Sequence, residues 1–194
     1  MVLTPSNMPK LGGVAPDFRL ADVTTGKLVT RDGAARKKGL LVMFICRHCP
    51  YVMHVQEELA RLGRDYAGSD VGIVAISAND PETHPEDAPA SLKQMARELG
   101  FTFPYAHDDT QAVAKAYGAA CTPDFFLYDG GLRLVYRGQL DDSRPGSGKP
   151  ATGRDLRAAL DAVIAGRPVS ADQKASLGCN IKWKPGNEPD YFRR

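Results

Sequence analysis

Two uninterrupted apolar runs dominate the pattern of hydrophobic and polar positions along the chain, at residues 40–46 and 71–77. Runs of this length without polar alternation are typical of strands that are buried on both faces of a sheet. Between them lies the segment 51–66, which we predict to be a helix. Its apolar side chains recur at helical spacing, at Val52, Val55, Leu59 and Leu62. The pattern therefore predicts two parallel strands that are joined by a right-handed helical crossover.

The rest of the chain predicts further helices and two antiparallel hairpins. Turn residues separate short apolar stretches within 18–29, at the N-terminal edge, and within 124–137, so we expect a hairpin at each place. A short edge strand is expected at 103–105, where a proline interrupts the run. Helical patterns cover 89–99, 110–117 and 153–165. This order of elements predicts a three-layer α/β sandwich, with a central mixed sheet and helices on both faces.

A single domain accounts for most of the 194 residues. We assign it to 1–165, with an irregular lead-in over 1–14 that is rich in glycine and proline. Residues 79–89 are turn-rich and acidic, and we expect a solvated surface insertion there. The segment 166–194 has no periodic pattern, so we interpret it as an extended C-terminal tail that is ordered only by docking on the domain.

Composition and charge narrow the possible partners. A formal net charge of +2 and the lack of a basic stripe give no reason to expect nucleic acid or anionic membranes as partners. The longest apolar stretch is far shorter than the ~20 residues that span a bilayer. The N-terminus shows neither a basic leader nor an apolar core, so no signal peptide is predicted and a cytoplasmic location is expected. Four cysteines in a reducing compartment indicate reactive thiols or metal ligands more than a disulfide scaffold.

The candidate chemistry lies where the first apolar run meets the helix, in Cys46-Arg47-His48-Cys49-Pro50. A Cys-x-x-Cys pair beside a β-α unit is typical of redox sites. Proline is favoured at the first position of a helix, so Pro50 predicts that Cys49 is the N-cap residue. The free amides and the positive end of the helix dipole favour a thiolate there. We therefore expect Cys49 to be ionised, open to substrate and the attacking thiol, with Cys46 as the resolving thiol.

Ionisation decides how reactive Cys49 is. Lowering a thiol pKa from ~8.5 to ~6.5 raises the thiolate fraction at pH 7 from about 3% to about 75%. Arg47 and His48 bring positive charge close to the pair, and we expect them to tune the thiolate. A better leaving thiolate makes a disulfide easier to reduce. The predicted couple is therefore more oxidising than a Cys-x-x-Cys couple in which the two residues between the cysteines are uncharged.

A second motif, Cys121-Thr122-Pro123, opens the first strand of the later hairpin. Through this motif and two other stretches, the chain resembles the thioredoxin superfamily. Within that superfamily it is most similar to the peroxiredoxin-like branch, of the alkyl hydroperoxide reductase and thiol-specific antioxidant type. The matching stretches are residues 13–20, 44–51 and 121–126. The resemblance covers most of the domain, and the tail segment 178–184 is similar to a motif that close relatives in this branch carry.

The resemblance implies a thioredoxin-like fold and a role for the second motif. Pro123 is expected to be cis, which is uncommon enough to make a sharp test. The backbone of Thr122 is expected to border the dithiol and to hold an extended substrate by main-chain hydrogen bonds.

One departure from the family bears on the reaction. Peroxiredoxins carry the motif P-x-x-x-T-x-x-C. Counted back from Cys49, the Thr and Pro positions hold Cys46 and Val42, and counted back from Cys46 they hold Met43 and Gly39. Neither cysteine fits, so the donors that would polarise a peroxide are not identified.

Two further thiols, Cys121 and Cys179, are candidates. Cys121 should lie close to the site, and Cys179 lies in a tail that can fold back across it. One interpretation is a Cys121–Cys179 bridge or a thiol relay from Cys49. The other is that Cys121 is a small buried hydrophobe and that Cys179 packs with Ile181 and Trp183. A zinc site built from all four cysteines is disfavoured, because such sites normally use two close-spaced pairs.

These observations predict a thiol–disulfide oxidoreductase with antioxidant activity and a role in cell redox homeostasis. Its redox-active disulfide, formed by Cys46 and Cys49, requires no metal and no organic cofactor. The expected partners are protein or small-molecule disulfides and a thiol reductant, and the sequence does not predict an oligomeric state. One alternative is a thiol-dependent peroxidase, in which Cys49 becomes a sulfenic acid that condenses with Cys46. Another is a non-catalytic redox-sensing module.

Overall fold

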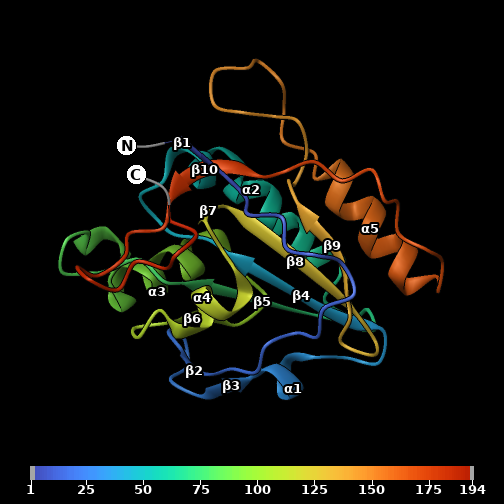
Figure 1. The fold of residues 1–194 in the computed structure, drawn as a ribbon, viewed down its shortest axis with the longest axis horizontal. Helices are drawn as coiled ribbons and strands as arrows, with labels where there is room; N and C mark the ends of the chain where they lie inside the picture. Colours follow the sequence, from blue (N-terminus) through green and yellow to red (C-terminus); the bar gives the residue numbers. More distant parts are fainter. Residues whose placement is uncertain (1–2, 193–194) are drawn as a thin grey trace.

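The computed structural model describes residues 3–192. Its elements, in chain order, are β1 (Leu3–Pro5), β2 (Arg19–Asp22), β3 (Leu28–Thr30), α1 (Arg31–Ala34), β4 (Gly39–Phe44), α2 (Pro50–Asp65), β5 (Val71–Ser77), the 3₁₀ turn η1 (Pro85–Asp87), α3 (Pro89–Leu99), β6 (Tyr105–His107), α4 (Ala112–Tyr117), β7 (Cys121–Thr122), β8 (Asp124–Asp129), β9 (Leu134–Gly138), α5 (Arg154–Ile164) and β10 (Leu177–Asn180). A seven-stranded sheet has the order β3-β2-β6-β5-β4-β8-β9, and a three-stranded sheet has the order β1-β10-β7 (Figure 1).

The predicted parallel unit forms the centre of the large sheet. β4 and β5 pair in parallel, with Leu41 opposite Ile73, and α2 connects them. Every residue of β4 is buried, because β5 and β8 flank it on either side and helices cover both of its faces. The two predicted hairpins are also confirmed, as β2 with β3 and as β8 with β9.

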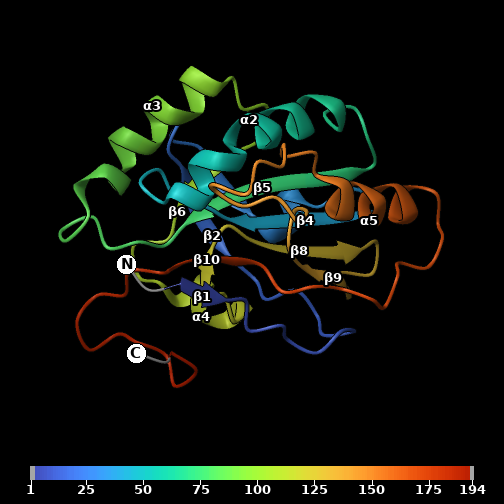
Figure 2. The same cartoon turned by 90° about the horizontal axis from the view of Figure 1, so that it is seen from above.

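Side chains of β4 alternate between two cores, one on each face of the sheet. Leu41 and Met43 pack in the core that includes apolar residues of α2, α3 and α5. Leu40, Val42 and Phe44 pack in the core that includes α4 and the end of the tail. Figure 2 shows these layers, with α2, α3 and α5 on one side of the sheet and α4 on the other. The predicted α/β sandwich is therefore confirmed.

Both ends of the chain form more regular structure than the sequence predicts. The lead-in contains β1, so the prediction of an irregular segment over 1–14 is wrong for Leu3–Pro5. β1 pairs with β10 of the tail, and β10 pairs with β7, with Cys179 opposite Thr122. These strands are too short to show an alternating pattern, and only their long-range pairing defines them. The tail therefore reaches the segment that precedes Pro123.

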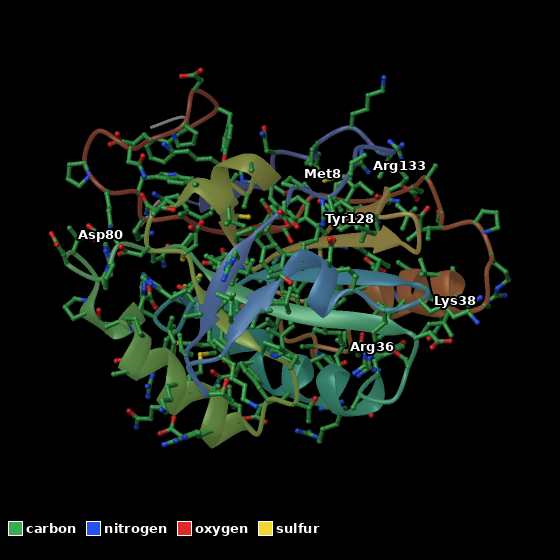
Figure 3. All side chains as sticks on the ribbon, turned by 90° about the horizontal axis from the view of Figure 1, so that it is seen from below. Met8, Arg36, Lys38, Asp80, Tyr128 and Arg133 are labelled. Carbon is green, nitrogen blue, oxygen red and sulfur yellow. The ribbon has the colours of Figure 1, made fainter. Side chains whose placement is uncertain are left out.

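Beyond β10, the tail closes the second core. Ile181 and Trp183 are buried in it. The backbone amide of Asp80 donates to the carbonyl of Lys182 at 2.8 Å, which ties the tail to the loop after β5. Figure 3 labels Asp80 on this loop, beside the tail. Over residues 3–192, none of the helices has both the length and the apolar character needed to cross a bilayer.

Candidate active site

Segments that are distant in sequence bring three sulfur atoms to one point. Cys46 follows the carboxyl end of β4, and Cys49 is the N-cap residue of α2, with Pro50 as the first helical residue. The peptide bond that precedes Pro123, between β7 and β8, is cis, so this prediction is confirmed. β10 carries Cys179 to the same place, and Figure 1 shows β7 and β10 near the start of α2.

Cys49 lies at the centre of the hydrogen-bond network of the site. Its Sγ lies 2.8 Å from the Sγ of Cys179 and 3.2 Å from the carbonyl oxygen of Thr122. Hydrogen bonds from the thiols of Cys179 and Cys46, and from the backbone amides of Val52 and Cys179, hold the pKa of Cys49 far below its ordinary value. They outweigh burial, which acts in the opposite direction. Cys49 is therefore the thiol of the site that ionises most readily.

Cys46 has the opposite tendency, although it lies only three positions away. Its Sγ is 3.2 Å from the hydroxyl oxygen of Thr122. Complete burial, followed by the hydrogen bond to Cys49, raises the pKa of Cys46 well above its ordinary value. Thr122 thus contacts both sulfur atoms, one through its carbonyl and the other through its side chain.

The thiols are closed off from solvent in this structure. Cys46, Cys49 and Cys121 are 0% exposed, and Cys179 is 1% exposed. The expectation that Cys49 is open to substrate is therefore wrong for this conformation. The reason is the tail, since β10 lies directly against the site.

A buried carboxylate that the sequence analysis missed organises the motif. Asp87 accepts hydrogen bonds from the backbone amides of Arg47 at 2.7 Å and His48 at 3.2 Å. It also accepts from the Nδ1 of His48 at 2.5 Å and the Nδ2 of Asn79 at 2.6 Å. Burial acts to raise the pKa of Asp87, but these donors outweigh it and lower that pKa.

The prediction of a solvated insertion over 79–89 is wrong for Asp80 and Asp87, which are both buried. Composition gives no sign that two carboxylates of an acidic loop turn inward. The one signal available is that this loop follows the carboxyl end of β5, and the carboxyl ends of parallel strands meet at the same edge of the sheet.

The side chains of Arg47 and His48 have different surroundings. The hydrogen bond with Asp87 raises the pKa of His48, and the negative charge of Cys49 acts in the same direction. The guanidinium of Arg47 donates to the carbonyl of Ser91 at 2.6 Å and so ties the motif to α3. We expect both residues to tune the thiolate, and of the two it is His48 whose pKa responds to the charge of Cys49.

Cys121 faces away from the other thiols. It pairs with Asn180 across the β7–β10 ladder, whereas its neighbour Thr122 pairs with Cys179. Successive residues of a strand point to opposite faces, so the sulfur of Cys121 does not share a face with that of Cys179. The structure therefore brings Cys179 to Cys49 and not into the bridge with Cys121 that the sequence suggests. Burial raises the pKa of the Cys121 thiol.

One group of described residues has the composition of a metal site. Cys46, His48 and Asp87 place possible ligand atoms within 4.8 Å of one another, and thiolate and imidazole are common ligands of Zn²⁺. The imidazole and the carboxylate already bind each other, and Asn79 occupies the same carboxylate oxygen. A cation would have to replace these hydrogen bonds.

Comparison with known proteins places the chain in a family. Residues 11–137, which contain Cys46, Cys49 and Pro123, match the AhpC/TSA family. The chain belongs to the AhpC/TSA family. The thiol-disulfide oxidoreductase ResA of Geobacillus thermodenitrificans is 30% identical over 135 residues, which cover 67% of this chain and 71% of ResA. Relatives with this name indicate that the AhpC/TSA protein described here is an oxidoreductase.

Solved structures are similar to this chain in fold. An uncharacterized conserved protein from Geobacillus kaustophilus has a TM-score of 0.94 at 54% identity, covering 96% of this chain and 98% of that one. The thioredoxin domain of a thiol-disulfide oxidoreductase from Bacteroides vulgatus has a TM-score of 0.61 at 19% identity, covering 80% of this chain and 99% of that one. The fold of this AhpC/TSA protein is therefore thioredoxin-like. The family match ends at residue 137, before β10 and Cys179.

Proposed function

We propose that the protein is a thiol–disulfide oxidoreductase in which Cys46 and Cys49 form the redox couple. The observation that carries the proposal is that Thr122, at the cis bond of Pro123, contacts both sulfur atoms, Cys49 through its carbonyl and Cys46 through its hydroxyl. The pKa is lowered for Cys49 and raised for Cys46, which fits Cys49 as the attacking thiol. The position of Cys49 at the start of α2, near the cis bond of Pro123, supports it. The name of the ResA relatives supports the same reaction class. A cytoplasmic location and a role in redox homeostasis are part of this proposal.

The reaction begins at Cys49. Its thiolate attacks one sulfur of a substrate disulfide, a mixed disulfide forms, and the other substrate sulfur leaves as a thiolate. Cys46 then attacks the Sγ of Cys49, so that the Cys46–Cys49 disulfide forms and the second substrate thiolate leaves. A thiol reductant restores both cysteines by the same exchange in reverse. These steps require no metal and no organic cofactor.

Cys46 must lose its proton before it can attack. Possible acceptor atoms of His48 and Asp87 lie within 4.8 Å of its sulfur. Asp87 is kept ionised by its donors, and its hydrogen bond with His48 allows a proton to be shared between carboxylate and imidazole. We therefore assign the role of proton acceptor to neutral His48, whose protonated form the hydrogen bond to Asp87 stabilises.

The closed site favours a second candidate, the reduction of a small hydroperoxide. Cys49 is 0% exposed beneath β10, so a small molecule needs less opening of the tail to reach its sulfur than a peptide does. In this reaction the Cys49 thiolate takes the terminal oxygen of the peroxide and becomes a sulfenic acid, while water or an alcohol leaves. Condensation with the Cys46 thiol then gives the same disulfide and a molecule of water.

Turnover measurements test the proposal. With insulin as the disulfide substrate and dithiothreitol as the reductant, we expect Cys49→Ser to lower the rate on the order of 10³-fold or more, because the nucleophile is lost. Cys121→Ser is the matched control and should keep the wild-type rate, because its sulfur faces away from the site. An unchanged rate for Cys49→Ser contradicts the proposal. Rapid peroxide consumption in a stopped-flow assay, without insulin reduction, replaces the first candidate with the second.

A further inference from the structure

β10 is held against the site as an added strand. It runs antiparallel to β7 and places the side chain of Cys179 opposite Thr122, whose carbonyl and hydroxyl contact Cys49 and Cys46. A side chain at this register position therefore points to the Cys-x-x-Cys pair. The sulfur that the tail places there lies 2.8 Å from the Sγ of Cys49.

The residue before Cys179 is required for this close approach. A Cβ atom on Gly178 would lie 2.0 Å from the carbonyl oxygen of Thr122 and 3.2 Å from the nitrogen of Pro123. Both distances are to backbone, which cannot turn away as a flexible side chain can. A glycine at 178 therefore allows β10 to reach the cis peptide bond.

Both ends of β10 are fastened, so that the position of Cys179 is defined. On the N-terminal side, the hydroxyl of Ser176 donates to the carbonyl of Gly138 at 2.8 Å. On the C-terminal side, the backbone amide of Lys182 donates to the Oδ1 of Asn79 at 2.8 Å. The Nδ2 of the same Asn79 donates to Asp87, so the tail and the carboxylate of the motif share one residue.

We propose that Cys179 is a third redox thiol of this site, which resolves Cys49 by forming a Cys49–Cys179 disulfide. The inference rests on the proposed function, in which Cys49 is the nucleophile. A disulfide bond is about 2.05 Å long, so the two sulfur atoms need to approach by less than about 1 Å to form it. The family match ends at residue 137, so nothing in the matched region assigns this thiol.

The exchange balances without an additional oxidant. When a substrate disulfide or peroxide has produced the Cys46–Cys49 disulfide, Cys179 loses its proton and its thiolate attacks the Sγ of Cys49. The Cys49–Cys179 bond forms, the Cys46–Cys49 bond breaks, and Cys46 leaves as a thiolate that takes up a proton. When Cys49 carries a mixed disulfide instead, the same attack releases the substrate thiolate.

The local electrostatics keep Cys179 inactive until Cys49 has reacted. Its hydrogen bond to Cys49, then burial, raise the pKa of Cys179, whereas the positive charge of Lys182 acts to lower it. Once Cys49 is part of a disulfide, it is no longer an anion that holds the proton of Cys179. The main cause of the raised pKa is then removed, and Cys179 can ionise and attack.

A variant without the competing thiol gives the sharpest test. In Cys46→Ser, Cys49 attacks the chromogenic disulfide DTNB and releases one thionitrobenzoate, and attack by Cys179 releases a second. With one DTNB per chain, we expect about two equivalents of thionitrobenzoate from Cys46→Ser and about one from Cys46→Ser/Cys179→Ser. Cys46→Ser/Cys121→Ser is the matched control and should still release about two.

Peptide mapping identifies the bond that forms. Trypsin separates all four cysteines into different peptides, because Arg47 lies between Cys46 and Cys49. The peptides are 39–47, 48–61, 116–133 and 175–182. After oxidation and alkylation, we expect 48–61 linked to 175–182 in Cys46→Ser, and both this link and the link of 39–47 to 48–61 in the wild type.

The outcomes separate the inference from the proposed function. If Cys46→Ser releases a single equivalent and retains a thionitrobenzoate adduct on Cys49 while Cys179 is alkylated, the inference is overturned and the proposed function stands. If Cys49 forms neither an adduct nor a disulfide in any variant, both fail.

Discussion

The site has two sides, and each contains a fully buried carboxyl group in a different electrostatic state. On the helix side, Asp87 accepts hydrogen bonds from the backbone and side chains around the motif, and its pKa is lowered. On the strand side, Asp124 follows the cis-proline, and burial raises its pKa to about 7. Within the described part of the chain, the Oδ1 of Asp124 has no hydrogen-bond partner. At Asp87 the donors and the charge of His48 outweigh burial, whereas at Asp124 burial outweighs the donors, so this balance decides which carboxyl is charged.

The thiols repeat this contrast. Cys49, at the start of α2, is surrounded by donors and ionises readily, whereas Cys121, on β7, is equally buried and holds its proton. Negative charge is thus concentrated where the amides of the motif and the helix start can stabilise it. The strand side supplies neutral groups, including the Cys179 thiol and the carbonyl of Thr122.

Removing the charge on the helix side should have the largest effect. We expect Asp87→Asn to lower the free energy of unfolding by about 3–5 kcal/mol at pH 7, because a buried ionic hydrogen-bond acceptor is lost. Its new amide would face the Nδ2 of Asn79, which cannot turn over without losing the bond from Lys182. Denaturant unfolding measures this loss.

The pH dependence of the same measurement checks its cause. The folded pKa of Asp87 is lowered, so its contribution is present above the unfolded pKa and disappears as the pH falls through the folded value. Glu86→Gln, an exposed neighbour, is the control and should change stability by less than about 0.5 kcal/mol. A loss for Asp87→Asn that is constant down to pH 2 would mean that packing, and not charge, is responsible.

On the strand side, replacing Asp with Asn should raise the free energy of unfolding instead of lowering it. The ordinary pKa of Asp124 is 3.8 and its folded value is about 7, so between these values the folded state holds the extra proton. Stability therefore falls as the pH rises from about 4 to about 7. We expect Asp124→Asn to remove this fall and to be more stable than the wild type by about 4 kcal/mol at pH 8. Thermal unfolding from pH 4 to pH 8 measures it, with the exposed Asp70→Asn as a control that should follow the wild type.

Much of the helix side could be predicted from the sequence. The apolar run of β4, the helical spacing of α2 and the proline at its first position are local patterns, and they predict where Cys46 and Cys49 lie. The family resemblance adds the cis bond of Pro123. Each of these features depends on neighbouring residues or on a motif of fixed spacing.

The strand side could not be predicted in the same way. β10 is a four-residue strand with a glycine in it, and its register opposite β7 joins positions that are far apart in the chain. On the helix side, one feature was equally unpredictable: the inward turn of Asp87 depends on donors from the motif and from Asn79, which composition does not reveal. The sequence names Cys179 as a candidate thiol, but its contact with Cys49 follows only from the tertiary structure.

Blocking the close approach of β10 should affect the strand side alone. We expect Gly178→Ala to destabilise the protein by about 1–3 kcal/mol, because its Cβ would overlap the backbone of Thr122. The fraction of Cys49–Cys179 disulfide after oxidation should fall, while the Cys46–Cys49 disulfide still forms. Tryptic mapping measures both. Gly13→Ala is the control, because its Cβ would be 3.6 Å from the nearest backbone atom, which is an ordinary contact. Unchanged disulfide fractions would show that β10 tolerates a side chain here.

The smallest effect should come from two stacked imidazoles at the rim of the helix side. His48 and His84 have ring centroids 4.8 Å apart, yet their pKa values shift in opposite directions. The hydrogen bond to Asp87 raises the pKa of His48, whereas burial and then the charge of His48 lower the pKa of His84. His48 therefore contributes stability below its unfolded pKa, and this contribution is lost as the pH rises through the higher folded value. His84 has the opposite sign, because protonating it in the folded state is unfavourable.

We expect His48→Gln to cost about 1 kcal/mol at pH 5.5 and less at pH 8.5, since solvent screens a partly exposed pair. His84→Gln should be neutral at pH 8.5 and slightly stabilising at pH 5.5. Denaturant unfolding of both variants at the two pH values gives four differences from the wild type, and the sign at pH 5.5 is decisive. If both variants lose stability there, the stacking of the rings matters more than their charges, and the contrast between donors and burial does not extend to the rim of the site.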